Sequence, residues 1–121
     1  MNGIVVELIG LAHGGSRHRA VEHLAYIVEI GGRRVLHTGD ADLSAETLRA
    51  FRLDTARIDV ALVPSWFIAD DEGRAVVQRW IKPKQVVAIH LPPQGEREAR
   101  KLSALLPGVV SFWRSLDVRS W

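Results

Sequence analysis

The chain has 121 residues, of which 47% are hydrophobic and 25% charged, with a formal net charge of +2. This composition is typical of one globular domain, expected over residues 1–121. The charge is too small to indicate nucleic-acid binding, and no apolar run reaches the roughly 20 residues of a membrane-spanning helix. Cysteine is absent, which excludes disulfides and thiolate ligands, so any metal must bind to His, Asp or Glu.

The start of the chain carries no targeting pattern. Residues 1–12 are apolar, but they contain Glu7 and lack a basic segment, so we expect no signal peptide. The absence of cysteine is compatible with a reducing compartment. We therefore expect a cytoplasmic protein.

Hydrophobic patterning predicts alternating strands and helices. Strands are expected over residues 4–9, 24–30, 33–37, 58–63, 85–90 and 109–113. Helices are expected over residues 44–53, 70–81 and 95–106. Gly31-Gly32 can adopt the positive φ of a two-residue hairpin turn. The order β-β-β-α-β-α-β-α-β predicts an α/β (or α+β) fold with a mixed sheet and helices on one face.

Three polar residues lie at or shortly after the ends of expected strands. Asp40 comes after the hairpin, Ser65 after the strand over 58–63, and His90 ends the strand over 85–90. Ligands in such sheets bind at the carboxyl ends of strands, which groups these side chains at one edge. His13 lies in a Gly-rich segment after the first strand. Two histidines and a carboxylate are a common ligand set for zinc, iron or manganese.

The order of His13, the hairpin running into Gly39-Asp40, and the strand ending in His90 resembles the C-terminal half of the metallo-β-lactamase-fold hydrolases. The resemblance implies one half of an αββα sandwich. It also implies one or two zinc ions held by His13, Asp40 and His90, with Asp40 as the catalytic carboxylate that orients water. The implied reaction is hydrolysis of an ester, amide or phosphodiester by metal-activated water.

The chain departs from that family in two respects. The family's N-terminal signature His-x-His-x-Asp-His has no match, and the chain has about half the family's length. One alternative is therefore a truncated or degenerate relative that acts as a non-catalytic binding or assembly module. The inner face of a single sheet should be an exposed apolar patch. A homodimer or a complementary N-terminal half from a separate polypeptide is expected to cover it.

Each candidate residue also has a structural interpretation. Asp40 can cap the following helix, and His90 can be a core histidine bonded to a backbone carbonyl. His13 can be a solvated loop residue, with His23 as the reserve ligand. His37 can either orient Asp40 or bond a neighbouring strand. The segment Ser65-Trp66-Phe67 can supply core anchors or wall a pocket beside the site.

Overall fold

The fold is built on one mixed six-stranded sheet. The computed structural model describes residues 3–12, 22–41 and 43–120, and its strands lie in the order β1-β2-β3-β4-β5-β6. β1 pairs with β2 and β2 with β3 in antiparallel fashion, whereas the remaining neighbours are parallel. This confirms the expected mixed sheet. The strands are β1 Val5–Ala12, β2 Glu22–Ile30, β3 Arg33–His37, β4 Val60–Pro64, β5 Gln85–Ile89 and β6 Val110–Ser111.

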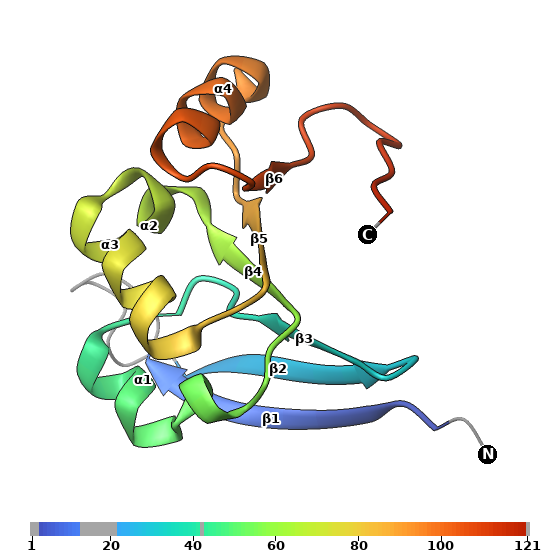
Figure 1. Ribbon diagram of the computed structural model, residues 1–121, viewed down its shortest axis with the longest axis vertical. Coiled ribbons are helices and arrows are strands. Elements are labelled where there is room, and N and C mark those ends of the chain that lie inside the picture. Colours follow the sequence, from blue (N-terminus) through green and yellow to red (C-terminus); the bar gives the residue numbers. More distant parts are fainter. Residues whose placement is uncertain (1–2, 13–21, 42, 121) are drawn as a thin grey trace.

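The helices cover one side of this sheet, and the segment after β6 lies on the other side (Figure 1). The α-helices are α1 Ala45–Phe51, α2 Ser65–Ala69, α3 Asp71–Val76 and α4 Gly95–Leu105. A single turn of 3-10 helix, η2 Leu53–Thr55, follows α1. A single turn of π-helix, η3 Val77–Ile81, follows α3. None of the helices in the described ranges is long and apolar enough to cross a membrane.

Two local features follow from capping chemistry. The Ser44 side chain accepts a hydrogen bond from the Thr47 backbone N at 3.2 Å and caps α1. Asp70 caps α3 in the same way, accepting from the Gly73 backbone N at 2.7 Å. Ser44, and not Asp40, is therefore the cap of α1.

The structure departs from the sequence-based boundaries in three places. β1 and β2 pair along their full length, to Ala12 opposite Glu22, so both strands extend into residues expected to form a loop. Arg52 adopts a left-handed conformation with φ of 51°, which ends α1 before the expected residue 53. α2 begins directly after Pro64, where only the end of a strand was expected.

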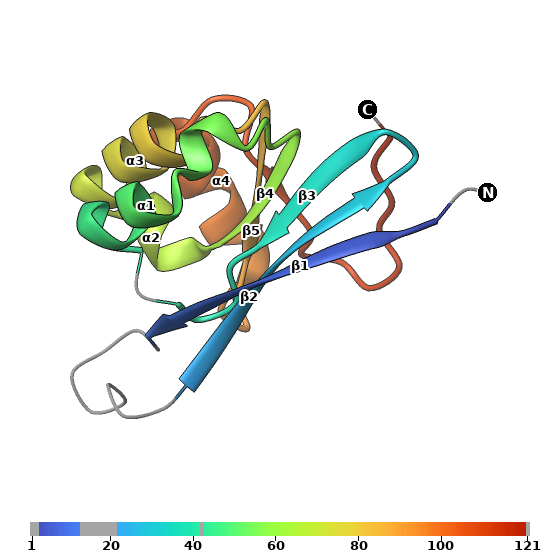
Figure 2. The same cartoon turned by 90° about the horizontal axis from the view of Figure 1, so that it is seen from below.

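The two faces of the β1–β3 region differ because side chains alternate along each strand. Ile9, Ile27 and Leu36 point toward the helices and are buried in the main core. On the opposite face, Leu8 and Tyr26 are 62% and 39% exposed. The apolar face expected from the sequence is therefore exposed. The hairpin of β1, β2 and β3 also extends beyond the helical layer (Figure 2).

Candidate functional site

Asp40 and His90 meet at the carboxyl edge of the sheet. Asp40 follows β3 and His90 follows β5, and these strands flank β4. The Asp40 Oδ1 atom lies 2.7 Å from the His90 Nε2 atom, and the two side chains are 37% and 44% exposed. The structure thus places a carboxylate and an imidazole in direct contact at a solvent-accessible edge.

The loop that carries Asp40 is tied to β4. The buried Thr38 hydroxyl and the Thr38 backbone N both donate to the Leu62 carbonyl, at 3.1 and 3.2 Å. The Ala41 backbone N donates to the Thr38 carbonyl at 3.2 Å and closes a turn around Asp40. Gly39 within that turn has a φ of 55°, a conformation that glycine adopts at little cost. These bonds define where the Asp40 backbone lies.

The first turn of α2 positions His90. The buried Ser65 hydroxyl donates to the His90 carbonyl oxygen at 2.9 Å. The Trp66 and His90 rings lie 5.4 Å apart between centroids and are tilted by 36°. His90 itself has a φ of 55°, which is uncommon for a residue with a side chain and needs support from its surroundings. The sequence placed Ser65 at this edge, but nothing in it indicated a bond to His90.

His23 and His37 both contact the turn that precedes Asp40. The His23 Nε2 atom lies 3.0 Å from the Thr38 carbonyl oxygen. A Cβ atom at Gly39 would lie 2.5 Å from that same Nε2, so the absence of a side chain makes room for the imidazole. The exposed His37 accepts a hydrogen bond from the Gly39 backbone N at its Nδ1, at 3.0 Å. His37 therefore supports the Asp40 turn.

The donors at this edge suit a divalent metal ion. A carboxylate oxygen and an imidazole nitrogen are zinc ligands, and two ligands of one tetrahedral ion lie about 3.3 Å apart. Asp40 and His90 need only a small separation to reach that distance. Among the described residues, no group of three His, Asp or Glu gathers to hold a metal. His13 lies outside the described residues, so its place in the site stays a prediction.

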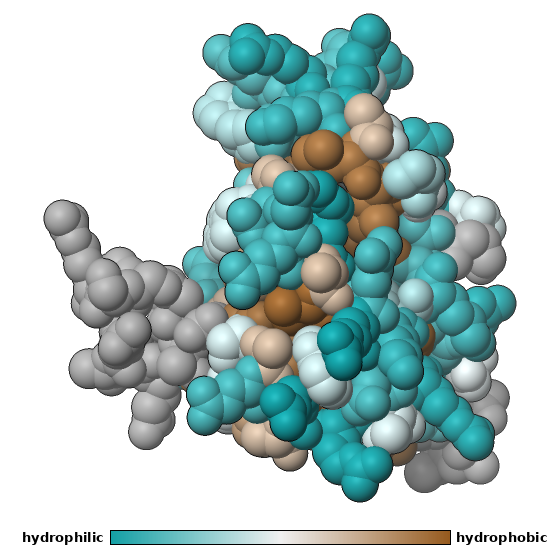
Figure 3. Space-filling view, turned by 60° about the vertical axis from the view of Figure 1, so that its left-hand side comes forward, coloured by the Kyte–Doolittle hydropathy of each residue, from teal (hydrophilic) through white to brown (hydrophobic). Residues whose placement is uncertain are grey.

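A hollow of about 320 Å³ adjoins the site on the helical side. Trp66 borders it and also contacts the His90 ring. Its other lining residues come from α1, α2, α3 and the turns before them: Leu43, Ser44, Ala45, Phe67, Asp70, Glu72, Gly73 and Val76. The helical side in Figure 3 shows apolar residues at the bottom of hollows between hydrophilic ones.

In sequence, the chain resembles metal-dependent hydrolases. No protein-family model matches it. It is 34% identical over 68 residues to a UPF0173 metal-dependent hydrolase of Symbiobacterium thermophilum, a match covering 54% of this chain and 30% of that protein. It is 30% identical over 77 residues to one of Polynucleobacter asymbioticus, covering 60% and 26%. The matched region thus spans less than a third of the length of either relative.

In structure, the chain matches about half of larger proteins. The metallo-β-lactamase fold protein YhfI of Bacillus subtilis superposes with a TM-score of 0.58 and 12% identity, over 89% of this chain and 45% of YhfI. A putative metal-dependent hydrolase of Parabacteroides distasonis also gives a TM-score of 0.58, with 21% identity, over 94% of this chain and 52% of that one. The chain therefore has the metallo-β-lactamase fold over about half of its usual extent and resembles metal-dependent hydrolases in sequence.

Proposed function

We propose that the chain forms the Asp40- and His90-bearing half of a metal-dependent hydrolase that cleaves an ester, amide or phosphodiester. The observation that carries this proposal is the 2.7 Å contact between Asp40 Oδ1 and His90 Nε2 at the carboxyl edge of the sheet. Asp40, His90 and His13 would hold one or two divalent ions, with zinc as the first candidate.

The chain's own residues divide the work between them. A bound zinc ion supplies Lewis acidity, which lowers the pKa of a water molecule toward neutrality. An Asp40 carboxylate oxygen would accept a hydrogen bond from the attacking water and orient it toward the substrate. Ser65 donates to the His90 backbone carbonyl and Trp66 contacts the His90 ring, and both contacts hold His90 in place. The hollow behind Trp66 gives a substrate group a partly apolar place to bind.

A second candidate is a non-catalytic binding or assembly module. The small number of possible metal ligands favours this candidate. Among the described residues, only Asp40 and His90 come together as a pair that could bind a metal ion. This candidate predicts a chain that folds identically with and without a chelator.

Metal binding and turnover separate the two candidates. The chain is dialysed against EDTA and then loaded with zinc or manganese. It is assayed with p-nitrophenyl acetate and bis-p-nitrophenyl phosphate. The hydrolase proposal predicts metal-dependent turnover that Asp40→Ala and His90→Ala abolish. Glu46→Ala, which removes an exposed carboxylate from α1, should leave it unchanged. Zinc uptake without turnover of either substrate class, or turnover unaffected by both site variants, would contradict the proposal.

A further inference from the structure

The hollow bordered by Trp66 has aromatic walls and shares one of them with the candidate site. Trp66 is 49% exposed, borders the hollow and lies 5.4 Å from the His90 ring between centroids. Phe67 is half-buried against the core and supplies a second ring. At about 320 Å³ the hollow is at the small end of ligand pockets. It therefore suits one chemical group of a substrate that is bound at the neighbouring site.

The charged residues that line the hollow are both acidic. They are Asp70 and Glu72, and the lining residues, all of which the structure describes, include no Lys or Arg. Asp70 accepts the Gly73 N–H at its Oδ2 atom, at 2.7 Å, and so uses one oxygen as a helix cap. Glu72 is exposed, and no cationic side chain of the described ranges pairs with it. The hollow thus presents a carboxylate that is open to an incoming cation.

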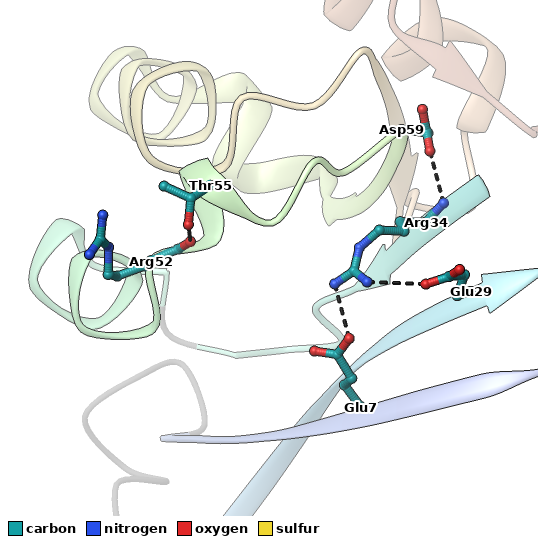
Figure 4. A network of polar contacts seen from close by, with 6 residues as sticks. All are labelled: Glu7, Glu29, Arg34, Arg52, Thr55 and Asp59. Carbon is teal, nitrogen blue, oxygen red and sulfur yellow. Dashed lines mark hydrogen bonds and ion pairs between the residues drawn. The ribbon is translucent and has the colours of Figure 1, made fainter. Parts of the chain in front are cut away.

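Carboxylates elsewhere in the chain are held by the protein itself. Arg34 forms ion pairs with Glu7 at 3.0 Å and with Glu29 at 3.2 Å. Asp59 accepts a hydrogen bond from the Arg34 backbone N at 2.9 Å, within the same network (Figure 4). Glu72 differs from these residues because a ligand can bind it without breaking an ion pair of the described chain.

We propose that the hollow binds a substituted ammonium group of the substrate and that Glu72 determines this specificity. Aromatic rings attract such cations through their π faces, and a nearby carboxylate adds Coulomb attraction. The apolar side chains of Leu43 and Val76 also line the hollow. They favour alkyl groups on the nitrogen, because a bare ammonium would lose hydrogen bonds to water on entering.

The substrate is then an ester, amide or phosphodiester that carries an alkylated ammonium group near the bond that is cleaved. That the cation belongs to a substrate rests on the proposed hydrolase function. Binding of the cation to the hollow does not, because it needs neither a metal nor turnover.

Glu72 also has a structural interpretation, which Glu46 shares. Each is the second residue after a helix cap, since Ser44 caps α1 and Asp70 caps α3. A carboxylate in a first turn stabilises a helix through the helix dipole, and this contribution is common to both residues. Glu72 lines the hollow and Glu46 does not. Glu46→Gln is therefore the matched control for Glu72→Gln.

An NMR titration of the metal-free chain with choline tests the binding. The control ligand is the neutral isostere of choline, in which a tert-butyl group replaces the trimethylammonium group. Choline should shift the indole N–H signal of Trp66, assigned with Trp66→Phe, and should bind at least about threefold more tightly than the isostere. Glu72→Gln should weaken choline binding by about threefold and leave binding of the isostere unchanged. Glu46→Gln should change neither.

A second variant strengthens the test. Asp70→Asn combined with Glu72→Gln removes both charges and keeps the α3 cap, because asparagine caps a helix as well as aspartate does. It should lower the preference for choline further than Glu72→Gln alone. Circular dichroism verifies that each variant is folded. The proposal is overturned if choline does not shift the Trp66 signal, if choline and its isostere bind equally, or if Glu72→Gln leaves choline binding unchanged.

Turnover by the zinc-loaded chain separates this inference from the proposed function. Acetylcholine should be hydrolysed with a higher kcat/KM than its neutral isostere, and Glu72→Gln should reduce this ratio. A chain that binds choline as expected but hydrolyses neither ester would count against the hydrolase function and support the cation site alone. Hydrolysis of both esters with equal kcat/KM would show that the hollow does not bind the substrate's cationic group.

Discussion

At the residue scale, the account depends on a small set of side chains around one turn. Asp40 and His90 contact each other, and their neighbours hold both backbones in place. The sequence predicted that Asp40 and His90 would share an edge, because both lie at the carboxyl ends of expected strands. It could not predict the left-handed conformation of His90 or its bond from Ser65, since both depend on how α2 lies against β5.

Asp40→Ala should remove metal binding and preserve the fold. Asp40 is partly exposed and does not cap α1, so the free energy of unfolding should change by less than about 1 kcal/mol. Zinc affinity should fall by more than about 100-fold. Loss of a residue that only orients a metal ligand lowers the affinity by about 10–100-fold, and loss of the ligand itself should lower it further. Isothermal titration calorimetry measures the affinity, and thermal denaturation measures the stability. An apo variant that no longer folds would show that Asp40 is a structural residue.

Ser65→Ala should weaken zinc binding through His90. The change removes the 2.9 Å hydrogen bond to the His90 carbonyl and costs about 0.5–1.5 kcal/mol of stability. Zinc affinity should fall by about tenfold, because His90 loses part of its positioning. Ser103→Ala, at an exposed serine of α4, is the control. A loss of stability with unchanged zinc affinity would assign Ser65 a purely structural role.

At the scale of elements, the order of strands and helices followed from hydrophobic periodicity and was confirmed. The helices α1 and α3 are capped by the side chains of Ser44 and Asp70. The boundaries of β1 and β2 were wrong, because pairing along the sheet extended both strands through residues of weak strand propensity such as Gly10. The five-residue α2 was missed, since so short a segment shows no helical period.

Gly73→Ala should force α3 away from α2 and destabilise the fold. A Cβ atom at Gly73 would lie 2.2 Å from the Phe67 carbonyl oxygen and 2.9 Å from its carbon, so backbone has to move. We expect a loss of about 1–3 kcal/mol in the free energy of unfolding, measured by urea denaturation. Gly10→Ala is the matched control, because nothing lies within 4 Å of the added Cβ. Equal stabilities of the two variants would contradict the packing described here.

Asp59 should make the fold sensitive to acid. Its Oδ1 accepts from Lys84 Nζ at 2.6 Å and its Oδ2 from the Arg34 backbone N at 2.9 Å. Asp59, which directly precedes β4, is thereby joined to β3 and to the residue before β5. The Lys84 hydrogen bond first, and then the Arg34 N–H, hold the pKa of Asp59 below its ordinary value of 3.8. This stabilisation is present above about pH 4 and is lost as the pH falls through the lower pKa of the folded state.

The comparison variant is Asp59→Asn. It should have a lower melting temperature than the unaltered chain at neutral pH, and the gap should narrow as the pH falls below about 4. Thermal denaturation followed by circular dichroism at a series of pH values measures the gap. A gap that is constant from neutral to acidic pH would show that the ion pair and the backbone hydrogen bond contribute no pH-dependent stability.

At the scale of the whole molecule, the sheet is covered on one side only. The helical layer buries a continuous core, while the opposite side of β1 and β2, with Leu8 and Tyr26, remains exposed. The sequence predicted this asymmetry from the likeness to half of a larger sandwich, and the solved structures it matches extend over about twice the matched length. What covers this exposed side of the sheet is not encoded in local patterning, because an apolar face fits another apolar face whatever its source.

Native mass spectrometry of the purified chain, before and after EDTA treatment, tests the central claim that Asp40 and His90 belong to a metal site. The account predicts one or two zinc ions per chain, which EDTA removes and added zinc restores, and no bound zinc in the Asp40→Ala variant. A chain that remains metal-free after incubation with zinc would contradict the claim and leave only the fold in common with metal-dependent hydrolases.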